Sequence, residues 1–236
     1  MTKSVKLVAL LLLSASTFSS NAQTADEIAA KHVEAIGGKE NWDKVKSTRQ
    51  EGKTKAQGMD IVVIRTQIDK KAMRMDISVM GMNGYQIVTN TEGWGFMPFA
   101  GQTKAEPMTA DDVKTSQDEL YIQDDFITYK ELGKKIEFIG KEDYDGTECL
   151  KMKMIDKDAV ETTYYLDPEN YYILKQSTKV KANGQEMDAV STFSDYKKLP
   201  EGIVAPMVIS GDFGNFEVTK YEVNPTIDEA IFKPTN

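Results

Sequence analysis

The chain has 236 residues and a mean hydropathy of −0.44, values typical of a globular protein able to bury a sizeable core. Its formal net charge of −8 argues against a nucleic-acid partner, because phosphate backbones are also negative. A single cysteine excludes an internal disulfide, and a single histidine leaves too few ligands for a histidine-based zinc site.

Residues 1–22 have the pattern of a secretory signal peptide. Two lysines precede an apolar run (7–13), and small polar residues follow it. The run is shorter than the about 20 residues that a membrane-spanning helix needs. We expect cleavage after Ala22, which removes the two lysines and no acid and so takes the net charge from −8 to −10. No cysteine follows the run where a lipid could be attached, so we expect one unanchored domain over 23–236.

A helix is predicted at the start of this domain. Thr24 and Glu27 form the sequence pattern of a capping box, and Gly37 marks the end of the helix. A second short helical turn follows at 40–45. The only histidine, His32, lies on the apolar side of the first helix. We therefore favour a packed or hydrogen-bonded core histidine over a catalytic one.

Beyond residue 48 the apolar residues recur with a period of two, which is typical of strands. The first strands are predicted at 59–68, 72–80, 84–90 and 92–99, and a helical insertion at 108–133. Strands resume at 134–146, 148–156, 160–167, 171–182, 184–197, 203–211 and 215–223. Short turns such as Asp145-Gly146 connect them, so the strands are expected to be antiparallel.

A sheet of about eleven strands does not stay flat, because strand twist accumulates along it. Helices must then cover its apolar face. We therefore predict a mainly β (α+β) fold: a single strongly curved antiparallel sheet, or half-barrel, with helices over the concave face.

The sequence offers little support for catalysis. It contains no H-E-x-x-H, C-x-x-C or G-x-S-x-G motif and no glycine-rich phosphate loop. Cys149 lies in a predicted strand, where an inert thiol is favoured over a nucleophile. The acidic stretch 142–148 reads as a hairpin turn, and Asp124 and Asp125 as solvated carboxylates. A glycosidase-like carboxylate pair from distant strands stays open as the weakest alternative. We expect no enzyme, no cofactor and no metal site.

Methionine and aromatic residues recur at alternate strand positions, and eleven of the twelve methionines follow residue 22. Ordinary core packing is the favoured interpretation for any single one of them. As a set, however, they fit an incompletely filled trough for acyl chains, since methionine adapts to ligands of variable shape. The candidate cavity-lining residues are Met73, Met75, Ile77, Trp94, Phe96, Leu150, Met152, Met154, Met187 and Phe193.

Several motifs, in their order and spacing, resemble those of one protein family. These are ADEIAAKHVEAIGGKENWDKVKS near the start, DKKAMRMDI followed by VTNTEGWGFMPF, then YYLDPENYYILK and SDYKKLPEGIVAPMVI. Together they cover most of residues 24–233. The chain resembles the LolA-like outer-membrane lipoprotein-sorting proteins, especially the divergent branch common in Bacteroidota.

The resemblance implies a half-barrel with a helical lid over an apolar cavity. It implies a periplasmic carrier of lipoprotein acyl chains or other lipids, served by an inner-membrane exporter and an outer-membrane acceptor, with no stable membrane insertion. It also implies a sheet arginine that bonds to the lid, for which Arg65 and Arg74 are the candidates. The alternative is a non-catalytic envelope module that binds a protein partner and has a filled core.

Overall fold

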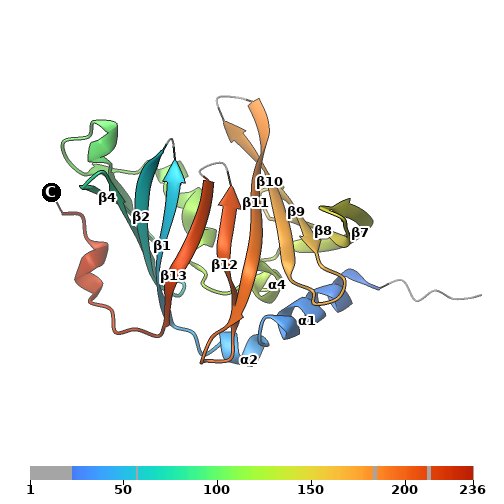
Figure 1. Cartoon of the computed structure of the whole chain (residues 1–236). Helices are drawn as coiled ribbons and strands as arrows, with labels where there is room; N and C mark the ends of the chain where they lie inside the picture. The colour runs from blue at the N-terminus through green and yellow to red at the C-terminus, as the bar shows by residue number, and fades with distance from the viewer. Residues whose placement is uncertain (1–22, 57, 183–184, 212–213, 236) are drawn as a thin grey trace, which may run out of the picture.

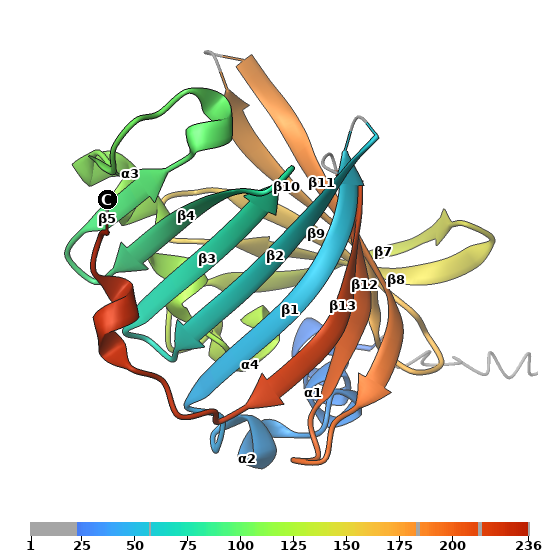
Figure 2. The same ribbon diagram turned by 60° about the vertical axis from the view of Figure 1, so that its left-hand side comes forward.

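The computed structural model describes residues 23–56, 58–182, 185–211 and 214–235, so the predicted signal peptide lies outside the described residues. Within them, thirteen strands form one sheet (Figures 1 and 2). The first six strands are β1 (Ser47–Ala56), β2 (Met59–Ile68), β3 (Ala72–Val79), β4 (Met82–Thr89), β5 (Gly93–Phe96) and β6 (Glu106–Pro107). The others are β7 (Lys135–Tyr144), β8 (Thr147–Ile155), β9 (Glu161–Leu166), β10 (Ile173–Ala182), β11 (Gln185–Lys198), β12 (Val204–Gly211) and β13 (Gly214–Val223).

The sheet combines two series of antiparallel hairpins. Its strand order is β6-β5-β4-β3-β2-β1-β13-β12-β11-β10-β9-β8-β7. The two series meet where β1 pairs with β13, and Thr48 lies opposite Val223 there. The sheet curls around a hollow side, as Figure 2 shows. The predicted mainly β fold with a curved antiparallel sheet is confirmed.

The strand count exceeds the predicted eleven by two. β1 lacks an apolar alternation, because its sequence, STRQEGKTKA, is almost entirely polar. It is nevertheless a central strand, hydrogen-bonded to both β2 and β13. β6 has only two residues and pairs with β5 through Trp94 and Gly95. Backbone pairing, rather than side-chain pattern, defines both strands.

The helices are short and lie mainly on the concave side and at one end of the sheet (Figures 1 and 2). They are α1 (Ala25–Ala35), α2 (Lys39–Trp42), α3 (Ala110–Thr115) and α4 (Asp125–Thr128), with the 3-10 helices η1 (Pro98–Ala100), η2 (Ser116–Leu120) and η3 (Glu229–Phe232). In the described part of the chain, no helix is long and apolar enough to cross a membrane.

Helix α1 begins with the predicted capping box. The Glu27 backbone N–H donates to Thr24 Oγ1 at 3.2 Å, and the Thr24 N–H donates to Glu27 Oε2 at 2.8 Å. These two bonds satisfy donors that the first turn leaves free.

Removal of this cap tests how firmly α1 is anchored. Thr24→Ala is expected to lower the free energy of unfolding by about 1 kcal/mol, because it leaves the Glu27 N–H without its acceptor. Urea denaturation measures the change. Thr24→Ser, which keeps the hydroxyl, is the matched control and should stay within a few tenths of a kcal/mol of the parent. Equal losses in both variants would contradict the role of the hydroxyl.

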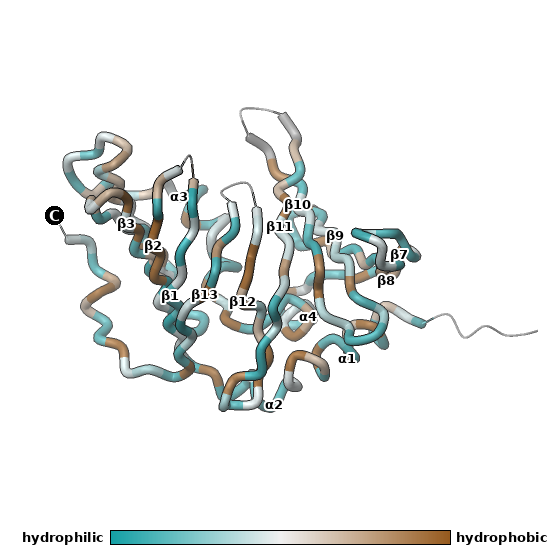
Figure 3. The backbone as a smooth tube through the Cα atoms, viewed as in Figure 1, coloured by the Kyte–Doolittle hydropathy of each residue, from teal (hydrophilic) through white to brown (hydrophobic). Residues whose placement is uncertain are grey.

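The concave core lies between α1, α4 and the strands β8 to β10. Leu150, Met152 and Met154 are 3%, 0% and 3% exposed. They pack with Ile28 of α1 and Phe126 of α4 in one cluster. The apolar side chains that alternate along the predicted strand 148–156 therefore face the helices. Figure 3 shows that α1 carries both apolar and polar positions.

The convex face also carries an apolar cluster, over β3 to β5. Tyr85 and Ile87 are buried there, and Trp94 and Phe96 pack against them. Phe232 of η3 covers this cluster from the C-terminal segment. The C-terminal segment therefore contacts the sheet on the outside of the half-barrel.

Candidate functional site

A cavity of about 760 Å³ lies on the concave side of the sheet. Its lining comes from α1, from the segment between β6 and β7, and from strands of both hairpin series. Small-molecule sites are typically about 300–1,000 Å³, so the space is large enough for a ligand. We call residues 116–128, which run from η2 through α4, the lid segment.

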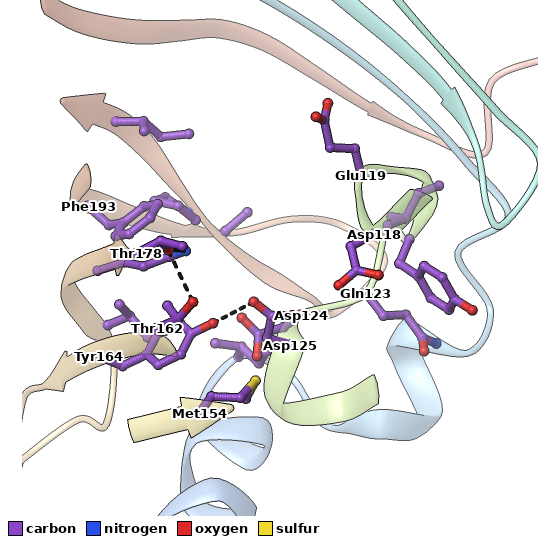
Figure 4. A pocket seen from close by; sticks show the side chains of 18 of the residues that line it. Asp118, Glu119, Gln123, Asp124, Asp125, Met154, Thr162, Tyr164, Thr178 and Phe193 are labelled. Carbon is purple, nitrogen blue, oxygen red and sulfur yellow. Dashed lines mark hydrogen bonds between the residues drawn. The ribbon is translucent and has the colours of Figure 1, made fainter. Parts of the chain in front are cut away.

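One wall of the cavity is apolar. Met154 of β8, Ile173 of β10, Phe193 of β11 and Ile209 of β12 line it. Phe193 and Ile209 lie directly opposite each other in the β11–β12 register. Thr162 and Thr178 interrupt this wall, and their hydroxyls are 3.1 Å apart (Figure 4).

The facing wall is polar and belongs to the lid segment. Asp118, Glu119, Gln123, Asp124 and Asp125 lie there (Figure 4). The cavity is therefore amphipathic, and the prediction of a trough lined by methionine and aromatic residues is wrong for this wall.

Two of these carboxylates share one lysine as their ion-pair partner. Lys134 Nζ lies 2.8 Å from Asp118 Oδ2 and 2.9 Å from Asp125 Oδ1. Burial acts to lower the pKa of Lys134, but Asp125 and Asp118 outweigh it and raise the pKa. The Tyr164 hydroxyl donates to Asp125 Oδ2 at 2.6 Å, and burial raises the pKa of Tyr164. Asp125 is thus held by two partners and is 35% exposed, rather than being the freely solvated carboxylate expected from the sequence.

Arg65 joins the sheet to the lid segment. Its Nη2 donates to the backbone carbonyl of Glu119 at 3.1 Å, and Gln67 Nε2 donates to the same oxygen at 2.8 Å. Next to them, the Lys70 N–H donates to the Leu120 carbonyl at 2.8 Å. Burial lowers the pKa of Arg65. Of the two candidate arginines, Arg65 is therefore the one that contacts the lid segment.

Arg74 lies on the opposite, convex face. Its guanidinium contacts Asp76 Oδ1 at 2.7 Å and donates to the Ile231 carbonyl at 2.7 Å. It also stacks over the Tyr85 ring, 4.4 Å from its centre. Arg74 therefore holds the C-terminal segment, and its candidacy as a lid residue is wrong.

The structure brings together only some of the ten predicted cavity residues. Met154 and Phe193 line the cavity. Leu150 and Met152 lie beneath α1 and α4, where helix side chains fill the space. Met187 shares the face of Phe193 but is 50% exposed at the far end of β11.

The predicted residues in β3 and β5 lie apart from the cavity. Met73 and Met75 are on the concave side, packed beneath Leu120. Ile77 shares their face by register. The placement of Trp94 and Phe96 on the concave face is wrong, because both pack on the convex cluster.

The other residues considered for chemistry in the sequence, Cys149 and the stretch 142–148, lie outside the cavity lining. Within the described residues, no three His, Cys, Asp or Glu side chains come together as a metal site would need. Cys149 is buried, and burial raises the pKa of its thiol. The acidic stretch 142–148 is the hairpin between β7 and β8, with Asp145 and Gly146 at positive φ.

Sequence comparison finds no matching protein-family model and no matching curated protein. Solved structures do match. An outer membrane lipoprotein-sorting protein domain from Vibrio parahaemolyticus is 11% identical, with a TM-score of 0.52 over 88% of this chain and 95% of that one. A LolA superfamily protein from Nitrosomonas europaea is 12% identical, with a TM-score of 0.55 over 90% and 98%. A DUF1329 family protein from Desulfovibrio piger gives the same identity, TM-score and coverage. The fold is therefore LolA-like.

Proposed function

We propose that this protein is a non-catalytic carrier of acyl chains, taken from a lipoprotein or another lipid. The observation that supports the proposal is the 760 Å³ cavity between a curved sheet and a lid segment. A filled interior would have favoured the alternative, an envelope module that only binds a protein partner.

We further propose that the carrier works in the periplasm, between an inner-membrane exporter and an outer-membrane acceptor. The signal-peptide pattern of residues 1–22 supports export. The LolA-like fold supports the same role, because two of the similar solved structures are named as lipoprotein-sorting or LolA superfamily proteins.

The two walls of the cavity suggest how the cargo lies. An acyl chain would contact Met154, Ile173, Phe193 and Ile209 on the apolar wall. Each methylene removed from water contributes roughly 0.8 kcal/mol, so about ten methylenes give roughly 8 kcal/mol before the costs of ordering. The polar lid segment would face the ester or headgroup end. Such binding is firm enough for transport and weak enough for release.

A cavity-filling substitution tests the proposal. Ile209→Trp is expected to weaken the binding of a fluorescent fatty acid at least tenfold, because the indole occupies the space beside Phe193. Fluorescence titration of the purified protein measures the change.

Val208→Trp is the matched control, since Val208 is the next residue of β12 and faces the other side of the sheet. It should bind the probe as the parent does. No saturable uptake by the parent, or equal losses in both variants, would contradict the carrier function.

A further inference from the structure

The only histidine of the chain lies between two hydrogen-bond acceptors. His32, on α1, is 1% exposed. Its Nδ1 is 2.7 Å from the backbone carbonyl oxygen of Tyr171. Because a carbonyl oxygen only accepts, Nδ1 must carry a proton. The tautomer of the ring is thus fixed by the backbone.

The other ring nitrogen faces the lid segment. Nε2 of His32 lies 3.3 Å from Asp124 Oδ1 and has no other partner among the described side chains and backbone. With Nδ1 protonated, a neutral ring would turn the Nε2 lone pair towards a carboxylate. The imidazolium form instead directs an N–H and a positive charge at Asp124. Only this form suits both neighbours.

Asp124 is the residue at which α4 begins. Its Oδ1 accepts the backbone N–H of Phe126 at 2.8 Å and so caps the helix. The Phe126 ring also packs edge-on against His32, with 5.3 Å between ring centres. The charge on His32 is therefore coupled directly to the position of α4 and to the wall of the cavity.

Other charged and titratable groups line the same cavity as His32 or contact its hydrogen-bond partner Tyr171. They are Asp124, Asp125 and Lys134 at the lid segment, Tyr164 of β9, Tyr196 of β11, and Lys31 with Tyr171, whose hydroxyl Lys31 contacts. Burial raises the pKa of both Tyr164 and Tyr196, away from neutrality. Histidine is the side chain whose ordinary pKa lies near neutral pH.

We propose that His32 is a protonation-controlled clasp: as imidazolium it holds Asp124 and keeps the lid segment closed, and loss of its proton to solvent lets the lid segment open. As a control on cargo exchange, this inference rests on the proposed carrier function. As a property of the lid segment, it stands without that function.

The direction of the pH dependence follows from the environment of the ring. Burial acts to lower the pKa of His32, but Asp124 and the Tyr171 carbonyl outweigh it and raise the pKa above the ordinary 6.5. A group with a raised folded pKa stabilises the folded form fully below its unfolded pKa, and that contribution disappears as pH rises through the folded pKa. The lid segment therefore opens more readily as the solution becomes more alkaline.

The single histidine makes the test direct. In a protein freed of any histidine tag, one imidazole signal in NMR reports His32 alone. Its pKa is expected above 6.5. Across the same titration, the protection of backbone amides in residues 121–128 against hydrogen exchange is expected to fall. The fall should be about tenfold for each unit by which the pKa is raised, after correction for the intrinsic exchange rate.

Two variants should abolish this pH-dependent fall in protection, which we call the pH step. His32→Gln removes the titrating group. Asp124→Asn removes the charge that the imidazolium faces but keeps an oxygen to cap Phe126, so it serves even where His32→Gln fails to fold. Tyr129→Phe is the control, because the Tyr129 hydroxyl bonds Asp26 of α1 at 2.5 Å without titrating near neutrality. It should lower protection equally at all pH values and keep the step.

A His32 pKa below 6.5, or lid protection that stays constant through the titration, would overturn the clasp. Release of a bound fluorescent fatty acid separates this outcome from the fate of the carrier function. If the exchange step occurs but no probe binds, the clasp stands and the carrier function fails. If the probe binds and leaves at a rate independent of pH, the carrier function stands and the clasp fails.

Discussion

Replacing Met152 with alanine is expected to lower the free energy of unfolding by about 2–5 kcal/mol. Met152 is fully buried. It lies in the cluster that joins β8 and β9 to α1 and α4, among Ile28, Phe126 and Tyr164. Truncation removes its contacts and leaves a cavity that these neighbours fill only in part.

Met187→Ala is the matched control for this prediction, because Met187 is the same residue type at 50% exposure. Its unfolding free energy should change by no more than about 0.5 kcal/mol. Urea denaturation of both variants, followed by circular dichroism, provides the comparison. Similar values for the two methionines would mean that α1 and α4 do not pack on β8 as described.

Arg65→Met is expected to loosen the lid segment. A hydrogen bond from a charged donor is worth about 1.5–3 kcal/mol, so its loss should increase lid opening about tenfold to a hundredfold. Gln67 would then be left as the one side chain that donates to the Glu119 carbonyl. Faster hydrogen exchange in residues 116–120 and faster release of a bound fatty-acid probe are the measurements.

Arg74→Met is the contrasting variant, because Arg74 lies on the other face of the sheet from Arg65. Arg74 holds Ile231 on the convex face, so its loss should speed exchange in residues 229–235 and leave 116–120 unchanged. A variant at Arg65 that altered only the C-terminal segment, or one at Arg74 that released the lid segment, would reverse the assignment made from the contacts.

The strand alternation predicted the fold well and the concave face of β8, but it placed Trp94 and Phe96 of β5 on the wrong face of the sheet. Met73 pairs with Val88, which pairs with Gly93, so this row faces the helices. Trp94, one position further on, therefore joins Ile87 on the outside. The face of each strand depends on cross-strand register, and a shift by one residue reverses it.

A second reason is that both faces of the first hairpin series are apolar. The C-terminal segment covers the convex face with Phe232, so aromatic residues are buried there as well as in the hollow. Apolar periodicity shows which residues of a strand lie together, but it does not identify the element that covers them. For the convex face that information is carried by Phe232, more than 100 positions away from the residues it covers.

The polar wall of the cavity could not be predicted from the sequence either. Asp124 and Asp125 look like ordinary surface carboxylates in QDDFITYK. Their partners are His32, on a helix about 90 residues earlier, and Tyr164, 39 residues later. Only the fold brings these groups together. The prediction of His32 as a packed or hydrogen-bonded core residue agrees with its position, whereas its ionic partner had no local signal.

The pairing of β1 with β13 limits how early the cavity can form during folding. Each hairpin series consists of local contacts, which form early in folding. The register that joins the series links Thr48 to Val223 and therefore cannot form until almost the whole chain has emerged. The cavity draws its lining from both series. A chain whose last strand, β13, has not yet been synthesised therefore cannot form the complete cavity, whatever the order in which the separate hairpins fold.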